Sequence, residues 1–247
     1  MRPFFIGFPL EYLRRMLPVI HSDADLVAID KPAGLLVHPS RLDAHEERTA
    51  LQLLQAQLGE RLFPLHRLDK GTSGVLLFAR TPDAARQWGG AFDRGEVRKR
   101  YLALVRGWPA ESGRIDYPLA RDPELPSSGQ ARVEAVTQFR RLACFEWPFS
   151  VDGRHPVSRY ALVDVNPLTG RRHQIRRHFK HIGHPLVGDA THGKGAHNRA
   201  VAAFLGTQRL WLHALSLVLP GGLRIEAACG PEWNGLGPPT AGAHTAE

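Results

Sequence analysis

The sequence predicts an α+β protein with a mixed, largely antiparallel sheet. Short β-branched or apolar runs recur along the chain, and each is bounded by Gly, Pro, Asn or Asp, as is typical of strands. Several of these runs follow one another without a helical segment between them, which favours α+β over a doubly wound fold. Only three segments show the spacing of apolar residues that predicts a helix.

The expected strands, in chain order, are Leu26–Asp30, Val75–Phe78, Tyr101–Val105, Tyr160–Val165, Leu210–Val218 and Leu223–Ala227. The first two helical segments are Leu51–Leu58 and Asp83–Phe92. The third follows Gly170, where Ile175, Phe179 and Ile182 fall at positions i, i+4 and i+7. A glycine and a proline, Gly183 and Pro185, are expected to end it.

The chain divides into one main domain with two short flanking segments. No linker interrupts residues 21–230, because the best candidate, 121–130, is short enough to be a hairpin or surface loop. Residues 1–20 form an N-terminal extension. Residues 231–247, rich in Gly, Pro, Ala and Thr towards their end, are expected to be disordered.

The charge balance predicts an anionic partner. Lys and Arg number 32 against 24 Asp and Glu, a formal net charge of +8, and there are 13 His in the 247 residues. Nucleic acid is the leading candidate, with a merely solvated basic surface as the alternative. The hydrophobic content of 43% is enough to bury an ordinary core, which excludes a largely disordered chain.

Cysteine usage and hydropathy predict a soluble cytoplasmic protein. Cys144 and Cys229 stand in no metal or redox spacing, which fits a reducing compartment. Prolines and charged residues interrupt the apolar N-terminus before a signal-peptide core can form. No apolar run reaches the length of a membrane span.

The segment His66–Gly74 (HRLDKGTSG) is the first candidate for chemistry. It places Asp69 between two basic residues and ends in a turn-forming Gly-Thr-Ser-Gly before an apolar strand. An Asp that must stay ionised and aimed at a substrate benefits from a cation and a rigid turn. An Asp that caps its own turn explains the segment equally well.

The segment Thr169–His181 has five Lys or Arg, three His and no acidic residue. Solvated helix faces usually mix charge signs, so this face is predicted to contact phosphates. His178, His181 and His184 lack the spacing and companions of a metal site, and we interpret them as basic helix surface.

Two further segments complete the pattern. Tyr101 begins an apolar strand directly after three cations, so its ring could belong to the core or stack on a nucleobase. The segment Asp30–Pro39 leaves a strand and turns sharply at Pro-Ala-Gly, and we interpret it as scaffold.

Together these segments resemble the RluA family of pseudouridine synthases. The family signature is KPxGxxVH, HRLDxxTSG, KxYxALVxG and TGRxHQ(I/L)RxH, and all four occur here in that order, with the resemblance covering about 23–216. It implies the pseudouridine synthase fold, with helices and loops flanking the sheet around a central cleft. Less general segments, such as Asp116–Leu119 and Arg176–His178, resemble the members that modify uridine 65 of tRNA. Gly71 departs from the family, which usually has Pro or Asp there.

The resemblance implies an isomerase that converts uridine in RNA to pseudouridine without cofactor or metal. Asp69 would be the catalytic carboxylate, as nucleophile or as base, with Arg176 paired to it by up to two hydrogen bonds. Tyr101 would stack on the flipped base and assist removal of the C5 proton. The substrate-binding residues would be Arg67, Ile175, His66, Thr72, Arg171, Arg172 and Arg177. The expected partner is tRNA and the expected state a monomer.

Three alternatives stay open at this stage. The enzyme could act on another tRNA uridine or on a ribosomal RNA uridine. The chain could be a non-catalytic basic RNA-binding protein. A nuclease or metallohydrolase built on the histidines near His178 is the third possibility, and chelation of metal would separate it from the others.

Overall fold

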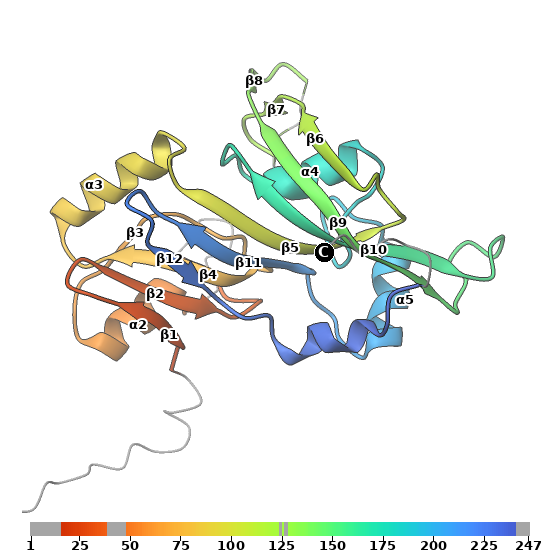
Figure 1. Cartoon of the computed structure of the whole chain (residues 1–247), viewed down its shortest axis with the longest axis horizontal. Coiled ribbons are helices and arrows are strands. Elements are labelled where there is room, and N and C mark those ends of the chain that lie inside the picture. The colour runs from red at the N-terminus through yellow and green to blue at the C-terminus, as the bar shows by residue number, and fades with distance from the viewer. Residues whose placement is uncertain (1–15, 39–47, 124, 126–127, 241–247) are drawn as a thin grey trace, which may run out of the picture.

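The computed structural model describes residues 16–38, 48–123, 125 and 128–240 (Figure 1). The strands are β1 (Val19–Ser22), β2 (Leu26–Lys31), β3 (Phe63–Pro64), β4 (Ser73–Ala79), β5 (Arg98–Arg106), β6 (Ser112–Asp116), β7 (Leu119–Ala120), β8 (Arg132–Val133), β9 (Val136–Trp147), β10 (Ser158–Pro167), β11 (Leu212–Val218) and β12 (Arg224–Glu226). The helices are α2 (Ala50–Leu58), α3 (Pro82–Asp93), α4 (Gln174–His181), α5 (Gly195–Leu205) and the 3-10 helix η2 (Pro231–Leu236).

Ten strands form one sheet in the order β1-β2-β4-β11-β5-β10-β9-β6, with β12 beside β11 and β3 beside β4; β7 and β8 pair separately. The β4–β11 pair is parallel and the other described pairs of the sheet are antiparallel. The prediction of an α+β fold with a mixed, mainly antiparallel sheet is therefore confirmed. Figure 1 shows β5 running through the middle of the molecule, between a half with β1–β4 and a half with β6–β10.

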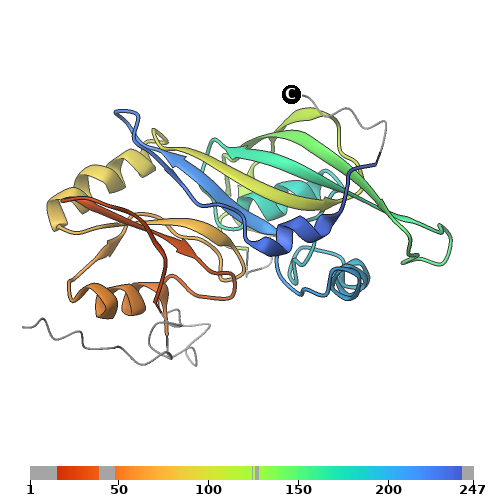
Figure 2. The ribbon, with the colours of Figure 1, turned by 60° about the horizontal axis from the view of Figure 1, so that its bottom comes forward.

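The sheet is buried on both faces. Successive side chains of a strand point to opposite faces, and in β4 Leu76 and Phe78 pack into one core while Val75 and Leu77 pack into another. The first core includes residues of α2 and α4, the second residues of α3. A third core, beneath β9 and β10, includes Val201 of α5. Figure 2 shows helices on both sides of the sheet.

Local sequence signals fix where the helices begin and end. Helix α2 opens with a capping box, in which the Thr49 side chain accepts a hydrogen bond from the N–H of Gln52, and closes at the left-handed Gly59. Helix α3 opens with Thr81 as N-cap and Pro82 in its first turn. None of the described helices is long and apolar enough to cross a membrane.

All six predicted strands and all three predicted helices are present, but β9 and α5 were not anticipated. In β9 the pair Arg140-Arg141 interrupts the alternation of apolar residues, and the facing strand shifts register between Leu162 and Val163. In α5 only Val201 is buried, so its sequence lacks a clear apolar stripe.

The expectation of disorder over 231–247 is wrong for its first part. Helix η2 buries Trp233 and Leu236, and the Trp233 ring packs edge-on against Trp211 with centroids 5.1 Å apart. Residues 241–247 lie outside the described residues, as do residues 1–15 of the expected N-terminal extension. The boundary expected at residue 20 falls inside β1, and Leu17 before it is already buried.

Candidate active site

Asp69 lies in the loop that joins β3 to β4. The N–H of Thr72 donates to the carbonyl oxygen of Asp69 at 3.0 Å, which closes a tight turn over the intervening residues. The carbonyl oxygen of Lys70 accepts from the N–H of Gly34 at 2.8 Å and from the ammonium of Lys31 at 3.2 Å. The segment interpreted as scaffold thus holds the loop that carries the Asp.

Lys31 is a fully buried cation beneath this loop. Its ammonium also donates to the carbonyl oxygens of Pro32 at 2.8 Å and Leu35 at 2.7 Å, so each of its hydrogens has an acceptor. Burial lowers the pKa of Lys31 to about 7, and the negative charge of Asp69 opposes this shift. Lys31 therefore ties two segments together, and its protonated form adds positive charge close to Asp69.

Two glycines allow the close packing around this turn. A Cβ on Gly71 would lie 2.9 Å from Cβ of Leu210, so the residue types usual at this position would require Leu210 to move. Gly74, with φ +107, lies against the backbone of Ala214 in the neighbouring parallel strand, where a Cβ would come within 2.2 Å of its carbonyl oxygen. Gly71 thus fits a tight contact with Leu210.

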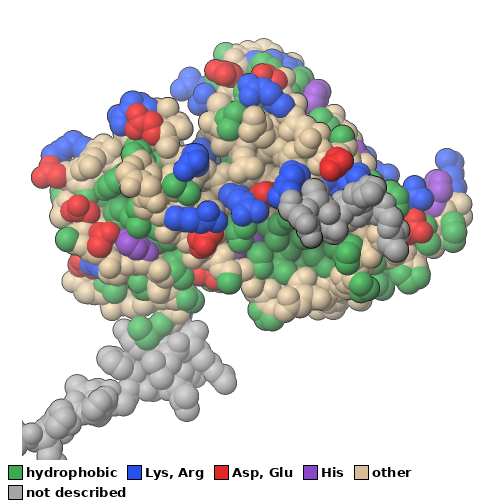
Figure 3. Space-filling view, in the orientation of Figure 1, with side chains coloured by type: hydrophobic (Ala, Val, Ile, Leu, Met, Phe, Trp, Pro, Cys, Tyr) green, Lys and Arg blue, Asp and Glu red, His purple; other side chains and the backbone are tan. Residues whose placement is uncertain are grey.

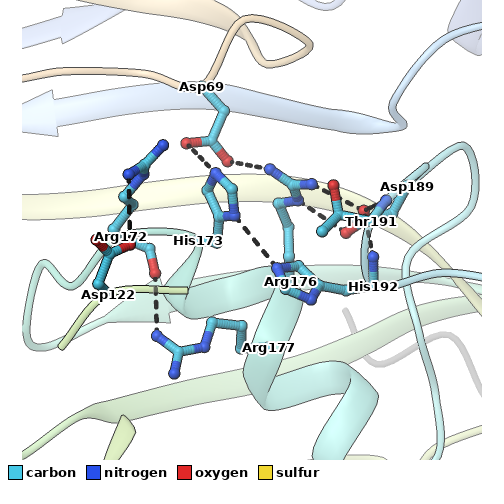
Figure 4. Close-up of polar contacts among 9 residues, drawn as sticks. All are labelled: Asp69, Asp122, Arg172, His173, Arg176, Arg177, Asp189, Thr191 and His192. Carbon is cyan, nitrogen blue, oxygen red and sulfur yellow. Dashed lines mark hydrogen bonds and ion pairs between the residues drawn. The ribbon is translucent and has the colours of Figure 1, made fainter. Parts of the chain in front are cut away.

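Arg176 of α4 is shared by two carboxylates (Figure 4). Its Nη1 donates to Oδ2 of Asp69 at 2.9 Å, while Nε and Nη2 donate to the two oxygens of Asp189 at 2.7 and 2.8 Å. The pairing of Arg176 with Asp69 agrees with the sequence expectation. The bidentate geometry, however, belongs to Asp189, and Asp69 receives a single hydrogen bond from Arg176.

Burial and ion pairing have opposite effects on the pKa values of Arg176 and Asp189. Burial disfavours the charge of Arg176, but its hydrogen bonds and ion pairs with Asp189 and Asp69 outweigh burial and raise its pKa. Burial likewise disfavours the charge of Asp189, and the contact with Arg176 lowers its pKa overall. Arg176 is thus a permanent, rigidly held cation beside Asp69.

A cavity of 280 Å³ opens beside Asp69. All of the predicted site residues except Arg177 line it, drawn from the Asp69 loop, β5 and the segment around α4: His66, Arg67, Asp69, Thr72, Tyr101, Arg171, Arg172, Ile175 and Arg176. Its volume lies close to the lower end of the range of about 300–1,000 Å³ for small-molecule sites. A cavity of this kind suits a single planar group.

The walls of the cavity combine apolar and titratable groups. Tyr101 and Ile175 are both buried, and burial together with the charge of Asp69 raises the pKa of Tyr101, so its hydroxyl is protonated. His66 accepts a hydrogen bond from the N–H of Leu77 at its Nε2 and stacks on Phe92. Burial lowers the pKa of His66 to about 3, which makes it a neutral wall residue.

Arg177 faces a second cavity, of 380 Å³, between α4 and the β7–β8 hairpin. It donates to the carbonyl oxygen of Ala120 at 2.9 Å. Arg132 and Lys180 line the same cavity, so its walls carry several cations. Lys and Arg side chains also gather across the middle of the face in Figure 3, in agreement with an anionic partner.

The expectation of a basic helix surface is wrong for His178, whereas His181 is exposed on α4. His178 is fully buried, with Nδ1 against Thr137 and Nε2 donating to the carbonyl oxygen of Tyr117 at 3.0 Å, and burial lowers its pKa. His181 stacks on Tyr117, and His184 contacts the carbonyl oxygen of Arg106. The described residues contain no group of three or more His, Cys, Asp or Glu placed to hold a metal ion.

Sequence reasoning missed two residues beside Asp69. Asp189, fully buried, comes from the loop after α4, and His173 precedes α4 with its Nε2 3.7 Å from Oδ1 of Asp69. A signal for Asp189 exists in hindsight, because a buried Arg requires a carboxylate partner and few acidic residues lie in this part of the chain. His173 was hidden among the other histidines of its basic segment.

Comparison with known proteins identifies relatives over most of the chain. Residues 25–181 match the family model described as RNA pseudouridylate synthase. The chain is 43% identical over 231 residues to the tRNA pseudouridine synthase C of Vibrio cholerae, covering 90% of this chain and 94% of the relative. The protein of the same name from Haemophilus ducreyi is 46% identical over 202 residues, covering 80% and 83% of the two chains.

Solved structures agree in fold. Human RNA Pseudouridylate Synthase Domain Containing 4 superposes with a TM-score of 0.67 at 27% identity, covering 91% of this chain and 92% of that one. Human RNA Pseudouridylate Synthase Domain Containing 1 gives a TM-score of 0.69 at 23% identity, covering 93% and 86%. The overall fold is therefore shared with these proteins.

Proposed function

The chain belongs to the RNA pseudouridylate synthase family and is an RNA-modifying isomerase, and we propose that it converts uridine 65 of tRNA to pseudouridine with Asp69 as the essential carboxylate. The tRNA substrate is carried over from the names of the relatives. The position rests on the resemblance of particular segments to the members that modify uridine 65. The assignment of Asp69 rests on the resemblance of its segment to the family signature, and the geometry around it supports this assignment.

The observation that carries this proposal is the pairing of Asp69 with a buried arginine, itself bound by Asp189, at the edge of the 280 Å³ cavity. The Asp69 side chain is 19% exposed, and that of Arg176 is 9% exposed. A carboxylate that reacts in such surroundings must remain ionised although water is largely excluded. The Arg176 contact at 2.9 Å provides the opposing charge and fixes one oxygen in place.

The cavity can hold a nucleobase only if that base leaves its stack. Unstacking costs a few kcal/mol in related enzymes that act on bases. In the proposed complex Tyr101 stacks on the flipped uracil and Ile175 bounds its other face, since both line the cavity with Asp69. Arg67 is exposed at the same cavity, where it could occupy the space that the base vacates.

The reaction rearranges bonds without net oxidation. The bond between N1 of uracil and C1′ of ribose breaks, the uracil rotates while bound, and C5 forms the new bond to C1′. C5 then loses its proton and N1 gains one, so atoms and charge balance. Asp69 acts either by attacking C1′ or by removing a proton from the sugar, and both routes require its ionised form.

Tyr101 has two proposed roles, and its protonation limits one of them. Its ring can stack on uracil whatever its ionisation state. Because the hydroxyl is protonated in the free protein, it can help remove the C5 proton only by passing on its own proton at the same time. Stacking is therefore the role that the free site is prepared for.

RNA outside the flipped base would be held through phosphates. Arg171 and Arg172 line the main cavity, and Arg177 lines the second one, so cations extend from the Asp69 site along α4. The A-form major groove is too narrow for side chains to read, so shape and backbone contacts dominate recognition of folded RNA. We also propose that the enzyme works as a cytoplasmic monomer.

The test is tritium release from tRNA that carries C5-labelled uridine. The purified protein is incubated with a tRNA transcript that has uridine at position 65 and with a matched transcript that has cytidine there. We expect release from the first transcript and none from the second. Release from both would place the target uridine elsewhere in the tRNA, and release only from ribosomal RNA would overturn the tRNA assignment.

Absence of release from every RNA offered would contradict the proposed reaction of this chain. The metal-dependent alternative is tested in the same assay by adding a chelator with a pre-folded transcript. The proposal predicts unchanged release, whereas a nuclease that uses bound metal would release no tritium from C5 and would instead cleave the transcript until the chelator is added.

A further inference from the structure

His173 occupies an unusual place at the start of α4. It has φ 53 and ψ 26, and it is the one non-glycine residue with positive φ among the described residues. His173 is the N-cap residue, yet its side chain makes no capping hydrogen bond. The turn before the helix is instead held by Gln174, whose Oε1 accepts from the N–H of Arg171 at 2.9 Å. The His173 side chain is therefore not needed to begin the helix.

The His173 ring lies between the catalytic loop and a second histidine (Figure 4). Its Nε2 is 3.7 Å from Oδ1 of Asp69, and its Nδ1 is 3.2 Å from Nε2 of His192. The two imidazole rings meet edge to face, with centroids 5.4 Å apart and planes at 72°. The backbone N–H of His192 donates to Oδ1 of Asp189 at 2.8 Å. The carboxylate that fixes Arg176 thus also fixes the loop that carries His192.

The surroundings of the pair favour neutral rings. Burial lowers the pKa of His173 and lowers that of His192 to about 4. The charged groups facing His173 are Asp69 from the catalytic loop, Arg172 and Arg176 from the segment around α4, and Asp189 from the following loop; those facing His192 are Asp189, Arg176 and Lys180. The negative charges oppose the effect of burial and the positive charges add to it.

When His173 and His192 are both neutral, a single ring hydrogen faces Asp69. Each neutral ring has one N–H and one bare nitrogen. If Nε2–H of His192 donates to Nδ1 of His173, the hydrogen of His173 must be on Nε2, which faces the carboxylate. In the reverse arrangement a bare nitrogen would face the negative oxygen, which is unfavourable. The contact with His192 therefore sets the tautomer that Asp69 requires.

We propose that His173 is a positioning residue for Asp69, and that His192 sets the tautomer of His173. This inference rests on the proposed function. Arg176 donates a hydrogen bond to Oδ2 of Asp69 at 2.9 Å, while Nε2 of His173 faces Oδ1 at 3.7 Å, which is an electrostatic contact beyond hydrogen-bond distance. The hydrogen bond fixes one oxygen, and the facing ring favours one rotation of the carboxylate about its Cβ–Cγ bond, so that Asp69 presents the same face to C1′ of each substrate.

Two variants test whether His173 acts through the contact of its ring with Asp69 or only through its backbone conformation. Asn tolerates the left-handed conformation of His173 and lacks the ring that reaches Asp69, so His173→Asn keeps the chain path and removes the donor. His192→Phe keeps a planar ring and removes the N–H that sets the tautomer. His155, an exposed residue distant in sequence that pairs with Asp152, provides the matched control His155→Asn.

The experiment measures tritium release from labelled tRNA as a function of tRNA concentration, together with the melting temperature of each variant. We expect His173→Asn to lower kcat by roughly tenfold with KM little changed, because a less well oriented carboxylate slows the chemical step and not substrate binding. His192→Phe should show the same changes to a smaller extent, and the double variant should be no worse than His173→Asn.

The activity of the wild type distinguishes failure of the proposed function from failure of the positioning role of His173. A wild-type protein without activity on any RNA would contradict the proposed function itself. With an active wild type, the positioning role is overturned if His173→Asn keeps its kcat, if it raises KM without lowering kcat, or if it loses activity only as its melting temperature falls. Full activity of His192→Phe beside an impaired His173→Asn would overturn the part assigned to His192. His155→Asn should match the wild type throughout.

Discussion

Asp189 binds the guanidinium of Arg176 through two hydrogen bonds, from Nε at 2.7 Å and from Nη2 at 2.8 Å. This leaves Nη1 to reach Asp69 at 2.9 Å. Asp189 is fully buried and also accepts the backbone N–H groups of Thr191 and His192. The carboxylate of Asp69, which we propose is catalytic, is therefore positioned by an arginine that is itself held rigid by a second carboxylate.

Asp189→Asn should impair both folding and turnover. The substitution keeps the size of the side chain but removes the charge that compensates buried Arg176, and breaking a buried ion pair typically costs about 3–5 kcal/mol. Misplacement of Arg176 should lower kcat by about a hundredfold. Urea unfolding and tritium release measure the two effects.

The control for this variant is Asp164→Asn, which breaks the pair between Asp164 and Arg100. Asp164 is buried, but the Arg100 side chain is 37% exposed and can turn to water, so this loss should cost less than loss of the Asp189 pair and leave kcat unchanged. Equal stability losses in the two variants would argue against a special role for the Asp189 pair.

Two substitutions of Tyr101 test the stacking role of its ring and the proton-transfer role of its hydroxyl separately. Tyr101→Phe keeps the stacking surface, whereas Tyr101→Leu removes it at similar volume. If stacking is the main role, Tyr101→Leu should raise KM or lower kcat/KM by the equivalent of about 1–3 kcal/mol. Tyr101→Phe should then retain substrate affinity, and single-turnover kinetics would show whether its proton transfer is slowed. Equal loss of affinity in both variants would contradict stacking.

Gly71→Ala should destabilise the protein although the residue lies in a turn. The added methyl would lie 2.9 Å from Cβ of Leu210, and overpacking of this kind typically costs about 1–3 kcal/mol. The comparison is Gly89→Ala in helix α3, where an added Cβ meets nothing within 4 Å. That variant should gain roughly 0.4–1 kcal/mol. A stable Gly71→Ala would show that the turn has room to adjust.

The burial of His66 predicts a loss of stability in acid. Its pKa is about 3 in the folded protein, below the ordinary value of 6.5, so the unfolded chain binds a proton that the folded chain does not. The contribution of neutral His66 to the free energy of unfolding is complete above pH 6.5 and is lost as the pH falls towards 3. His66→Gln, which can still accept the N–H of Leu77, should reduce the stability difference between pH 7 and pH 4.5 by up to about 3 kcal/mol. An unchanged difference would rule out His66 as its source.

The sequence predicted the strands and the cavity residues because both depend on short segments. Val75–Phe78 and Tyr101–Val105 are apolar runs bounded by polar or turn residues, and such runs are readable without tertiary information. The residues expected around Asp69 lie within the same short segments. Nine of the ten predicted site residues line one cavity, the exception being Arg177.

What the sequence did not reveal depends on distant contacts. Strand β9 contains Arg140 and Arg141 in its middle, and only its neighbours β6 and β10 make it a strand. His178 looked like surface because its own segment is polar, yet Thr137 and Tyr117 from other elements accommodate it in the core. The same holds for Asp189, whose partner Arg176 lies on a separate helix.

The most direct test of the central claim is the Asp69→Asn variant assayed for both tritium release and tRNA binding. Asn has nearly the size of Asp but cannot act as a nucleophilic or basic carboxylate. The account predicts that release falls below detection while tRNA affinity stays close to that of the wild type. Turnover by Asp69→Asn at the wild-type rate, or a loss of tRNA affinity by orders of magnitude, would contradict the role assigned to Asp69.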